Sequence, residues 1–404
     1  MAEESQRTRM LVLATAGFLI CFWAWALISP LAPAYAKELG LSAVQQSLLV
    51  AVPVVVGSLG RIPVGALTDR LGARTMFPAV AALTIVPVLF VGLAGTSYAA
   101  LLVGGFFLGI GGTAFAVGVP FVNAWFPPAR RGTAIGIFGA GMGGTAVSAF
   151  TTVAIADTWG RAAPFVLVAV VLAVYAVVAR LLLRDAPGRV PATGSFMARA
   201  WTTFKRPVAL KLSLLYAIGF GGFVAFSVYL PTYLVNAFGL TRGDAALRTA
   251  GFVVLAVAMR PVGGWISDKW HPVPVLAVCF LGVAALAGLA SLELALIPVG
   301  TVAFLGLAAF LGGASGAVFA LVSRLVEPPQ VGAVTGIVGA AGGLGGFIPP
   351  LVMGVIYSRS HDYSLGLALL ALVSLGTAVF TWRAFGTGRA RHTGAAATAG
   401  GTAS

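Results

Sequence analysis

The chain has 404 residues, of which 59% are hydrophobic and only 9% are charged. Soluble domains carry about a quarter charged residues, so this composition excludes an ordinary soluble protein and predicts a polytopic membrane protein. The net charge of +14 would indicate nucleic-acid binding in a soluble chain. Here we expect it from basic cytoplasmic loops, and the basic aromatic face of a nucleic-acid-binding domain is missing. Cys21 and Cys279 lie in separate apolar runs, which predicts neither a disulfide nor a metal site.

Twelve apolar runs are long enough to cross a bilayer as helices. They cover residues 10–35, 46–68, 75–95, 97–125, 133–156, 163–183, 208–236, 248–267, 273–294, 296–322, 333–357 and 364–385. The first run is too long for the apolar core of a signal peptide, although Ala34-Tyr35-Ala36 resembles a cleavage site. The sequence therefore predicts an all-α membrane protein with twelve transmembrane helices.

The distribution of Lys and Arg predicts that both termini lie in the cytoplasm. With that orientation, 18 basic residues fall on the cytoplasmic side and five fall outside, as the positive-inside rule requires. The five outer residues are Lys37, Arg161, Arg242, Arg248 and Arg359. Two basic residues remain, Arg61 and Arg260, and both lie inside predicted helices. The expected location is the cell (plasma) membrane.

A polar segment at 186–206 predicts a cytoplasmic linker between two six-helix halves, 1–185 and 207–385. Within it, aromatic and basic residues predict a short interfacial helix around Phe196, Trp201 and Phe204. Residues 386–404 are rich in Gly, Ala and Thr, and we expect this tail to be disordered.

The two halves contain repeated segments. Arg61 is followed by Gly65 four residues later and by Asp69 eight residues later, and the same spacing recurs from Arg260, 199 residues further on, to Asp268. A second pair consists of Gly132–Ala140 and Gly332–Ala340. A parallel repeat of two halves is typical of secondary transporters, whose substrate site lies between the halves near the membrane midplane.

Arg61 is predicted to lie near the middle of the membrane. It precedes Asp69 by eight residues, which is about 12 Å of helix, while half of the hydrocarbon core is about 15 Å. A guanidinium group there costs roughly 2.5 kcal/mol or more. Snorkelling to the interface or a structural ion pair would explain it, but all eleven acidic residues lie at predicted helix ends or in loops. We therefore favour an anion site, because two arginine forks match a small planar oxyanion.

The loop after the second predicted helix resembles the signature of the major facilitator superfamily, which implies that fold, with two pseudo-symmetric six-helix halves. The motif consists of Gly65, Asp69, Arg70, Gly72 and Arg74, with Asp268 in the second half. We interpret these charges as a latch between cytoplasmic helix ends and not as substrate ligands.

Over nearly its whole length the chain resembles the nitrate/nitrite porter family of that superfamily. The resemblance implies that Arg61 and Arg260 bind the substrate, that Tyr216 contacts it, and that Phe115 and Phe220 clamp it. The glycine-rich runs 139–144 and 339–346 resemble the paired signature motifs of the family. The substrate-binding set that the resemblance implies is Arg61, Arg260, Tyr216, Phe115, Phe220, Met142, Gly143, Gly342 and Gly343.

The chain departs from that family at one point. The family motif in the fifth helix usually carries an asparagine that contacts substrate, whereas this region reads Gly141-Met142-Gly143-Gly144. Selectivity among nitrate, nitrite and similar anions therefore does not follow from the resemblance. Taken alone, either phenylalanine is equally compatible with ordinary packing, Tyr216 with a helix–helix hydrogen bond, and the glycines with close helix packing.

The sequence thus predicts a monomeric, cofactor-free carrier of nitrate and nitrite that works by alternating access. The alternatives are a carrier of another small anion, such as cyanate, formate or a short carboxylate, and a general major facilitator transporter. A drug–proton antiporter is disfavoured because the predicted helices hold no central carboxylate, and a receptor because no segment can form an output domain. An enzyme is disfavoured because His271, His361 and His392 lie in loops or the tail. Without a titratable group near the centre, we expect anion exchange and not proton coupling.

Overall fold

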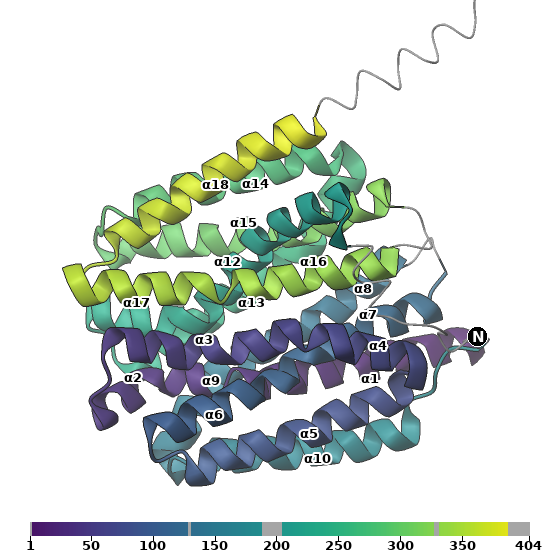
Figure 1. The fold of residues 1–404 in the computed structure, drawn as a ribbon, viewed down its shortest axis with the longest axis horizontal. Helices are drawn as coiled ribbons and strands as arrows, with labels where there is room; N and C mark the ends of the chain where they lie inside the picture. The colour runs from purple at the N-terminus through teal and green to yellow at the C-terminus, as the bar shows by residue number, and fades with distance from the viewer. Residues whose placement is uncertain (1, 128–130, 188–203, 327–330, 387–404) are drawn as a thin grey trace, which may run out of the picture.

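The computed structural model describes residues 2–127, 131–187, 204–326 and 331–386. Within these ranges it contains 12 helical spans that are long and apolar enough to cross a membrane, which confirms the predicted number. The helices lie side by side along one direction, and the N-terminus and the end of the last helix lie at the same end (Figure 1). The interfacial helix predicted around Phe196 and Trp201, and the tail 387–404, lie outside the described residues.

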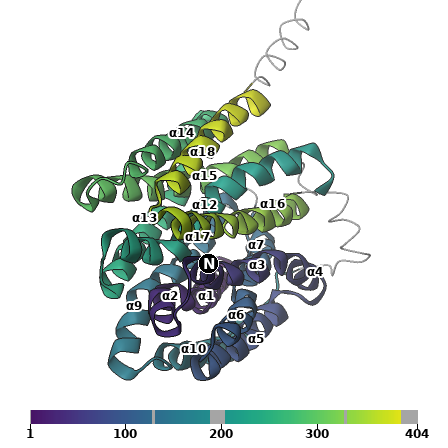
Figure 2. The ribbon, with the colours of Figure 1, turned by 60° about the vertical axis from the view of Figure 1, so that its left-hand side comes forward.

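Several spans consist of two helices in sequence. In the first half, the helices are α1 (Ala2–Trp25), α2 (Ile28–Leu39), α3 (Ala43–Leu59), α4 (Arg61–Leu71), α5 (Ala73–Ala94), α6 (Tyr98–Leu108), α7 (Ala114–Trp125), α8 (Arg131–Gly139), α9 (Gly144–Trp159) and α10 (Ala163–Leu182). In the second half, they are α12 (Pro207–Phe238), α13 (Arg242–Trp270), α14 (Pro272–Ala290), α15 (Thr301–Leu325), α16 (Val331–Gly345), α17 (Ile348–Ser360) and α18 (Ser364–Phe385). Figure 2 shows the first half below and the second half above.

Two helices begin earlier than their apolar runs, because side chains cap them. Helix α3 begins at residue 43 and not at 46, since Ser42 and Gln45 form a reciprocal capping box. Helix α13 begins at residue 242 and not at 248, since the Thr241 hydroxyl accepts a hydrogen bond from the Asp244 main-chain N–H. Hydropathy alone places these starts too late because the first turns are polar.

Besides the first span, which is divided at residues 26–27 between α1 and α2, three spans of the first half are interrupted midway. The break between α3 and α4 falls at Gly60, immediately before Arg61. Short 3₁₀ turns, Gly109–Thr113 and Ala140–Gly143, separate α6 from α7 and α8 from α9. Such irregular backbone is tolerated in a membrane only where it is buried in protein or lines a cavity. The breaks therefore mark the interior of the bundle near Arg61.

Close backbone packing repeats in both halves. A Cβ atom on Gly112 would contact the backbone of Gly57 in α3, and a Cβ atom on Gly312 of α15 would contact the backbone of Ala256 in α13. These two contacts are related by the same spacing of about 200 residues as the sequence repeat. Small residues allow the backbones to approach closely, and one turn further along α15, Gly316 lies against the carbonyl of Arg260.

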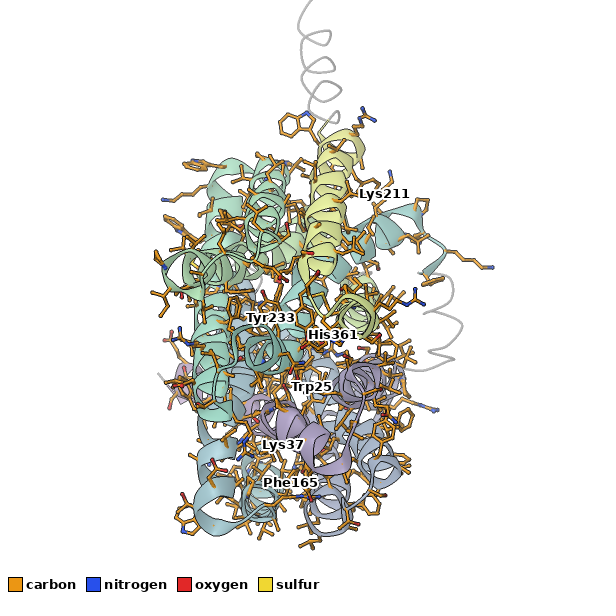
Figure 3. All side chains as sticks on the ribbon, turned by 90° about the vertical axis from the view of Figure 1, so that its left-hand side faces the viewer. Trp25, Lys37, Phe165, Lys211, Tyr233 and His361 are labelled. Carbon is orange, nitrogen blue, oxygen red and sulfur yellow. The ribbon has the colours of Figure 1, made fainter. Side chains whose placement is uncertain are left out.

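Polar contacts join the two halves at the end predicted to be external. Ser29 of α2 donates a hydrogen bond to the carbonyl of Val228. In α3, Gln46 Nε2 lies 3.2 Å from Thr232 Oγ1 of α12. An ion pair of 3.3 Å links Arg242 of α13 to Asp157 of α9, and α3 lies beside α17 in Figure 1. Seen from this end, Lys37 and Phe165 belong to the lower half and Tyr233 and His361 to the upper half (Figure 3).

Replacing Gly316 with alanine is expected to destabilise the second half and to displace Arg260. The new methyl group would meet the backbone of α13, which cannot rotate away as a side chain can. Such overpacking costs about 1–3 kcal/mol, so thermal unfolding in detergent should begin at a lower temperature. The control is Gly376→Ala in α18, whose Cβ would contact no atom within 4 Å. Equal melting temperatures for both variants would contradict this packing.

Candidate functional site

Arg61 lies at the first position of α4, directly after the helix break, and only 6% of it is exposed. Its Nη1 atom donates a hydrogen bond of 2.7 Å to the carbonyl of Gly339 in the second half. Its Nε atom donates one of 3.3 Å to the carbonyl of Gly112 in the 3₁₀ turn of the first half. Main-chain oxygens from both halves therefore solvate this guanidinium group.

Arg260 makes the reciprocal connection from the second half. It lies within α13 and is partly buried, and its Nη2 atom donates a hydrogen bond of 3.0 Å to the hydroxyl of Tyr216 in α12. Its Nη1 atom contacts the sulfur of Met142, a fully buried residue of the first half. Each of the two repeated arginines thus reaches into the opposite half.

Aromatic rings lie against both guanidinium groups. The centroid of the Phe220 ring is 5.7 Å from Cζ of Arg61 and 5.3 Å from Cζ of Arg260. The Phe115 ring lies 5.1 Å from Cζ of Arg61. Tyr216 stacks on Phe220 with centroids 4.8 Å apart and an angle of 8° between the rings. The structure therefore brings the five predicted side chains into one cluster, within distances typical of cation–π contact.

Acidic side chains do not enter this cluster in the described part of the chain. The described acidic residues lie at helix ends or in loops, and they are Glu4, Glu38, Asp69, Asp157, Asp185, Asp244, Asp268, Glu293 and Asp362. The same ranges contain no group of three His, Cys, Asp or Glu residues that could hold a metal ion. The prediction that the acidic residues avoid the middle of the helices is confirmed for these residues.

The predicted glycines occupy three different environments. A Cβ atom on Gly342 would collide with Tyr216 and Phe220, and one on Gly343 would collide with Ser58 of α3. Both glycines therefore permit close packing around the cluster. A Cβ atom on Gly143, by contrast, would have no atom within 4 Å.

Phe18 of α1 belongs to the same aromatic cluster, although the sequence did not single it out. Its ring lies 5.7 Å from Phe115 and stacks on Phe138 at 4.8 Å. The sequence contained an indication of this, because Phe18 precedes Tyr216 by 198 residues, which is close to the 199-residue offset between Arg61 and Arg260. Helices α1 and α12 therefore both contribute aromatic side chains to the cluster.

The loop motif has a partner that the sequence analysis overlooked. Gly72 caps α5 with φ of 82°, a conformation that favours glycine. The Asp185 carboxylate lies against this turn and accepts a hydrogen bond of 3.2 Å from the main-chain N–H of Arg74. In the second half, Arg324 Nη2 donates to the carbonyl of Asp268 at 3.3 Å. The charge latch proposed for Asp69 and its neighbours stays a prediction.

A tyrosine network lies at the end predicted to be external. The hydroxyl of Ser47 in α3 lies 3.2 Å from that of Tyr229, which lies 3.3 Å from the hydroxyl of Tyr363. Asn236 donates a further hydrogen bond of 3.1 Å to Tyr363. Burial raises the pKa of Tyr363, with a further contribution from Tyr229, so its hydroxyl stays protonated and remains a hydrogen-bond donor at neutral pH.

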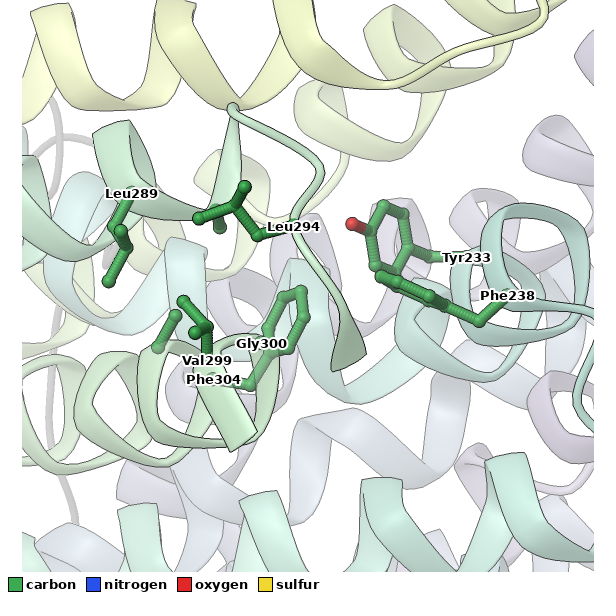
Figure 4. Close-up of a pocket in the computed structure, with 9 residues that line it drawn as sticks. Tyr233, Phe238, Leu289, Leu294, Val299, Gly300 and Phe304 are labelled. Carbon is green, nitrogen blue, oxygen red and sulfur yellow. The ribbon is translucent and has the colours of Figure 1, made fainter. Parts of the chain in front are cut away.

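A small pocket at this end of the second half is not the anion site. Its space for a solvent molecule is only about 10 Å³, and it is lined mainly by apolar side chains (Figure 4). Tyr233 and Phe238 of α12 form one wall, and Phe304 of α15 faces them. Tyr233 is 17 residues from Tyr216, which corresponds to about 25 Å along the helix. No guanidinium group lines the pocket.

Comparison with known proteins identifies the class. The family profile of the Major Facilitator Superfamily matches residues 14–319 and 212–404. The fold is similar to the inward-facing, occupied crystal structure of a bacterial homolog to the human lysosomal transporter Spinster, with a TM-score of 0.70 and 19% identity over 93% of this chain and 94% of that one. The chain belongs to the major facilitator superfamily and has its fold. It is a multi-pass membrane transporter and not an enzyme.

Curated relatives identify the branch. The chain is 49% identical to the probable nitrate/nitrite transporter NarK2 of Mycobacterium tuberculosis, over 92% of this chain and 95% of the relative. It is 37% identical to the nitrite extrusion protein of Bacillus subtilis, over 90% of each. It is 36% identical to the probable nitrate transporter NarT of Staphylococcus aureus, over 92% and 94%. Within the superfamily it therefore belongs to the nitrate/nitrite porters, as the sequence predicted.

Phe220→Ala is expected to weaken the binding of planar anions more than the binding of chloride. The ring faces both guanidinium groups, so its loss removes a flat surface from the cluster and changes the surroundings of both charges. The matched control is Phe223→Ala, because Phe223 is equally buried, one turn away in α12 and stacked on Phe220 at 5.9 Å. Binding can be measured by calorimetry in detergent. Equal losses for nitrate and chloride would instead indicate a purely structural role for Phe220.

Proposed function

We propose that this protein carries nitrate and nitrite across the cytoplasmic membrane, by alternating access of its two halves around a two-arginine anion site. Three relatives that match at least 90% of the chain are named as transporters of these anions. The observation that carries the proposal is that two arginines from repeated segments converge on the single ring of Phe220. Both termini are expected in the cytoplasm, and a monomer suffices because both halves lie in one chain.

Each side chain of the cluster has a role in this proposal. Arg61 and Arg260 hold the anion oxygens, because each planar fork can donate two parallel hydrogen bonds. Tyr216 donates its hydroxyl hydrogen, and it is held in place by its stacking on Phe220. Phe115 and Phe220 flank the site and favour a flat anion over a tetrahedral one. The hydrogen bonds of Arg61 to two carbonyls are exchanged for bonds to the anion on binding.

The signature glycines and Met142 shape this site. Met142 lies in the segment where the family motif usually carries a substrate-contacting asparagine, and it touches Arg260. A thioether accepts hydrogen bonds only weakly, so Met142 positions the guanidinium group without competing strongly with an anion. Gly143 leaves open space beside it, whereas Gly342 and Gly343 allow α16 to approach the cluster.

Alternating access requires contacts between the halves that can separate. The polar contacts at the external end, among them Gln46 with Thr232 and Ser47 with Tyr229, close that side in this conformation. Neutral hydrogen bonds between membrane helices contribute only about 0.6 kcal/mol on average, so a few of them can break during a transport cycle. In our proposal they separate when the site opens outward.

In this proposal, the positive charges of Arg61 and Arg260 couple the transport of one anion to that of another. An empty site has two guanidinium groups and no acidic partner among the described residues, and these groups repel each other as the halves close. An anion offsets part of this charge and permits closure. Nitrate uptake is therefore coupled to nitrite release, and the empty carrier returns slowly.

Purified protein in liposomes should take up nitrate and nitrite in preference to cyanate and formate.

Arg61→Lys and Arg260→Lys should each abolish uptake while the protein stays folded, because lysine retains the charge but loses the planar fork. A lost hydrogen bond to a charged group costs about 1.5–3 kcal/mol, which is roughly 10- to 100-fold in affinity. The control is Arg359→Lys at the exposed end of α17. Near-normal uptake by either site variant would contradict the two-arginine site, and a preference for cyanate or formate would reassign the substrate.

Nitrate uptake should require an anion inside the vesicles and should respond little to an imposed pH gradient. Vesicles loaded with nitrite are expected to take up labelled nitrate, whereas anion-free vesicles should not. A control with an acidic exterior and a protonophore tests proton coupling directly. Robust uptake into anion-free vesicles that the protonophore stops would refute exchange but would leave the anion site intact.

A further inference from the structure

Ser213 of α12 differs from most hydroxyl residues of the bundle. In the membrane-spanning helices, Ser58, Thr84 and Ser315 donate to the carbonyl four residues earlier, at 2.7 to 2.8 Å. Ser213 is 8% exposed, its Oγ atom is buried, and that atom has no hydrogen-bond partner among the described residues. An unsatisfied buried hydroxyl costs about 1–3 kcal/mol, so its presence needs an explanation.

The position of Ser213 connects it to the arginine cluster. Ser213, Tyr216 and Phe220 stand at positions i, i+3 and i+7 of α12, so they share one helix face. On that face, Tyr216 packs against Gly342 of α16, and Val224, further along α12, packs against Gly346.

Because these two contacts advance together along both segments, α12 and α16 run in the same direction. Ser213 lies one turn before Tyr216 in α12, as Gly339 lies one turn before Gly342 in α16. The carbonyl of Gly339 accepts the hydrogen bond of Arg61 that crosses between the halves. Ser213 thus lies one helical turn from Tyr216, whose hydroxyl accepts the hydrogen bond of Arg260.

The chemistry of the two anions suggests what Ser213 recognises. Nitrate is a planar ion with three oxygens, whereas nitrite has two oxygens and a nitrogen lone pair. Two oxygens suffice for bidentate contact with an arginine fork. A third oxygen needs a further donor to replace its hydration, and an unsatisfied hydroxyl one turn from Tyr216 can supply it.

We propose that Ser213 Oγ donates a hydrogen bond to the third oxygen of nitrate and so favours nitrate over nitrite. This assignment rests on the proposed function and deepens it, because it names the side chain that distinguishes the two substrates. The corresponding motif of the first half reads Gly141-Met142-Gly143-Gly144 and contains no asparagine, and in this proposal Ser213 supplies a polar contact from the second half.

The test compares Ser213→Ala with wild type in two assays. One is competitive uptake of nitrate and nitrite into liposomes, and the other is thermal stabilisation by nitrate in detergent. We expect the apparent nitrate affinity to fall about tenfold, the order expected for one hydrogen bond to a charged group, and the nitrite affinity to change less than about twofold. The nitrate-induced rise in melting temperature should also shrink, and about tenfold more nitrate should be needed to reach the wild-type shift, because the stabilisation depends on the ratio of ligand concentration to Kd. Without ligand, the variant should melt no lower than wild type, because the hydroxyl has no protein partner to lose.

Ser374→Ala is the matched control, since Ser374 is also buried and without a partner among the described residues but lies in the peripheral α18. Ser213→Cys, a weaker donor of similar size, should show a smaller loss of nitrate affinity. Equal changes for nitrate and nitrite, or none, would overturn the assignment of Ser213. Wild-type protein that takes up neither anion would overturn the proposed function itself, and with it this assignment.

Discussion

The burial of two guanidinium groups in the middle of a membrane bundle is the constraint on which the rest of this structure depends. Each such charge costs about 2.5 kcal/mol or more at the bilayer centre, and no described acidic residue lies beside either group. The cost is offset by weaker partners placed around them, namely the carbonyls of Gly112 and Gly339, the Tyr216 hydroxyl and the Phe220 ring. Partial compensation of this kind leaves the charges able to attract an anion.

The backbone is arranged to supply these partners. The second span breaks immediately before Arg61, and the fourth span has a 3₁₀ turn that presents the carbonyl of Gly112. Glycines let neighbouring helices approach closely enough for such contacts, as where Gly316 lies against the carbonyl of Arg260. The high glycine content, 53 residues, is therefore in part a consequence of holding charged side chains between closely packed helices.

The repeat explains why the cluster is shared between the halves. Arg61 extends from the first half to Gly339, and Arg260 extends from the second half to Met142. A site built from reciprocal contacts changes whenever the halves move relative to each other. In the proposed cycle, the anion replaces some of these contacts, so its binding energy is coupled directly to the rearrangement of the external contacts around Tyr229 and Arg242.

The sequence by itself determined the twelve spans, and it predicted the two halves and a role for Arg61 and Arg260, because apolar length and misplaced charge are local properties that can be read residue by residue. It also pointed to Tyr216, Phe115 and Phe220, but only through a family resemblance. It assigned no functional role to Phe18, Asp185 or Ser213, because an aromatic ring, a loop carboxylate and a helical serine are ordinary residues until their neighbours are known. Only the tertiary structure decided which carbonyls solvate each guanidinium group and which buried hydroxyl lacks a partner, since these depend on contacts between segments up to 278 residues apart.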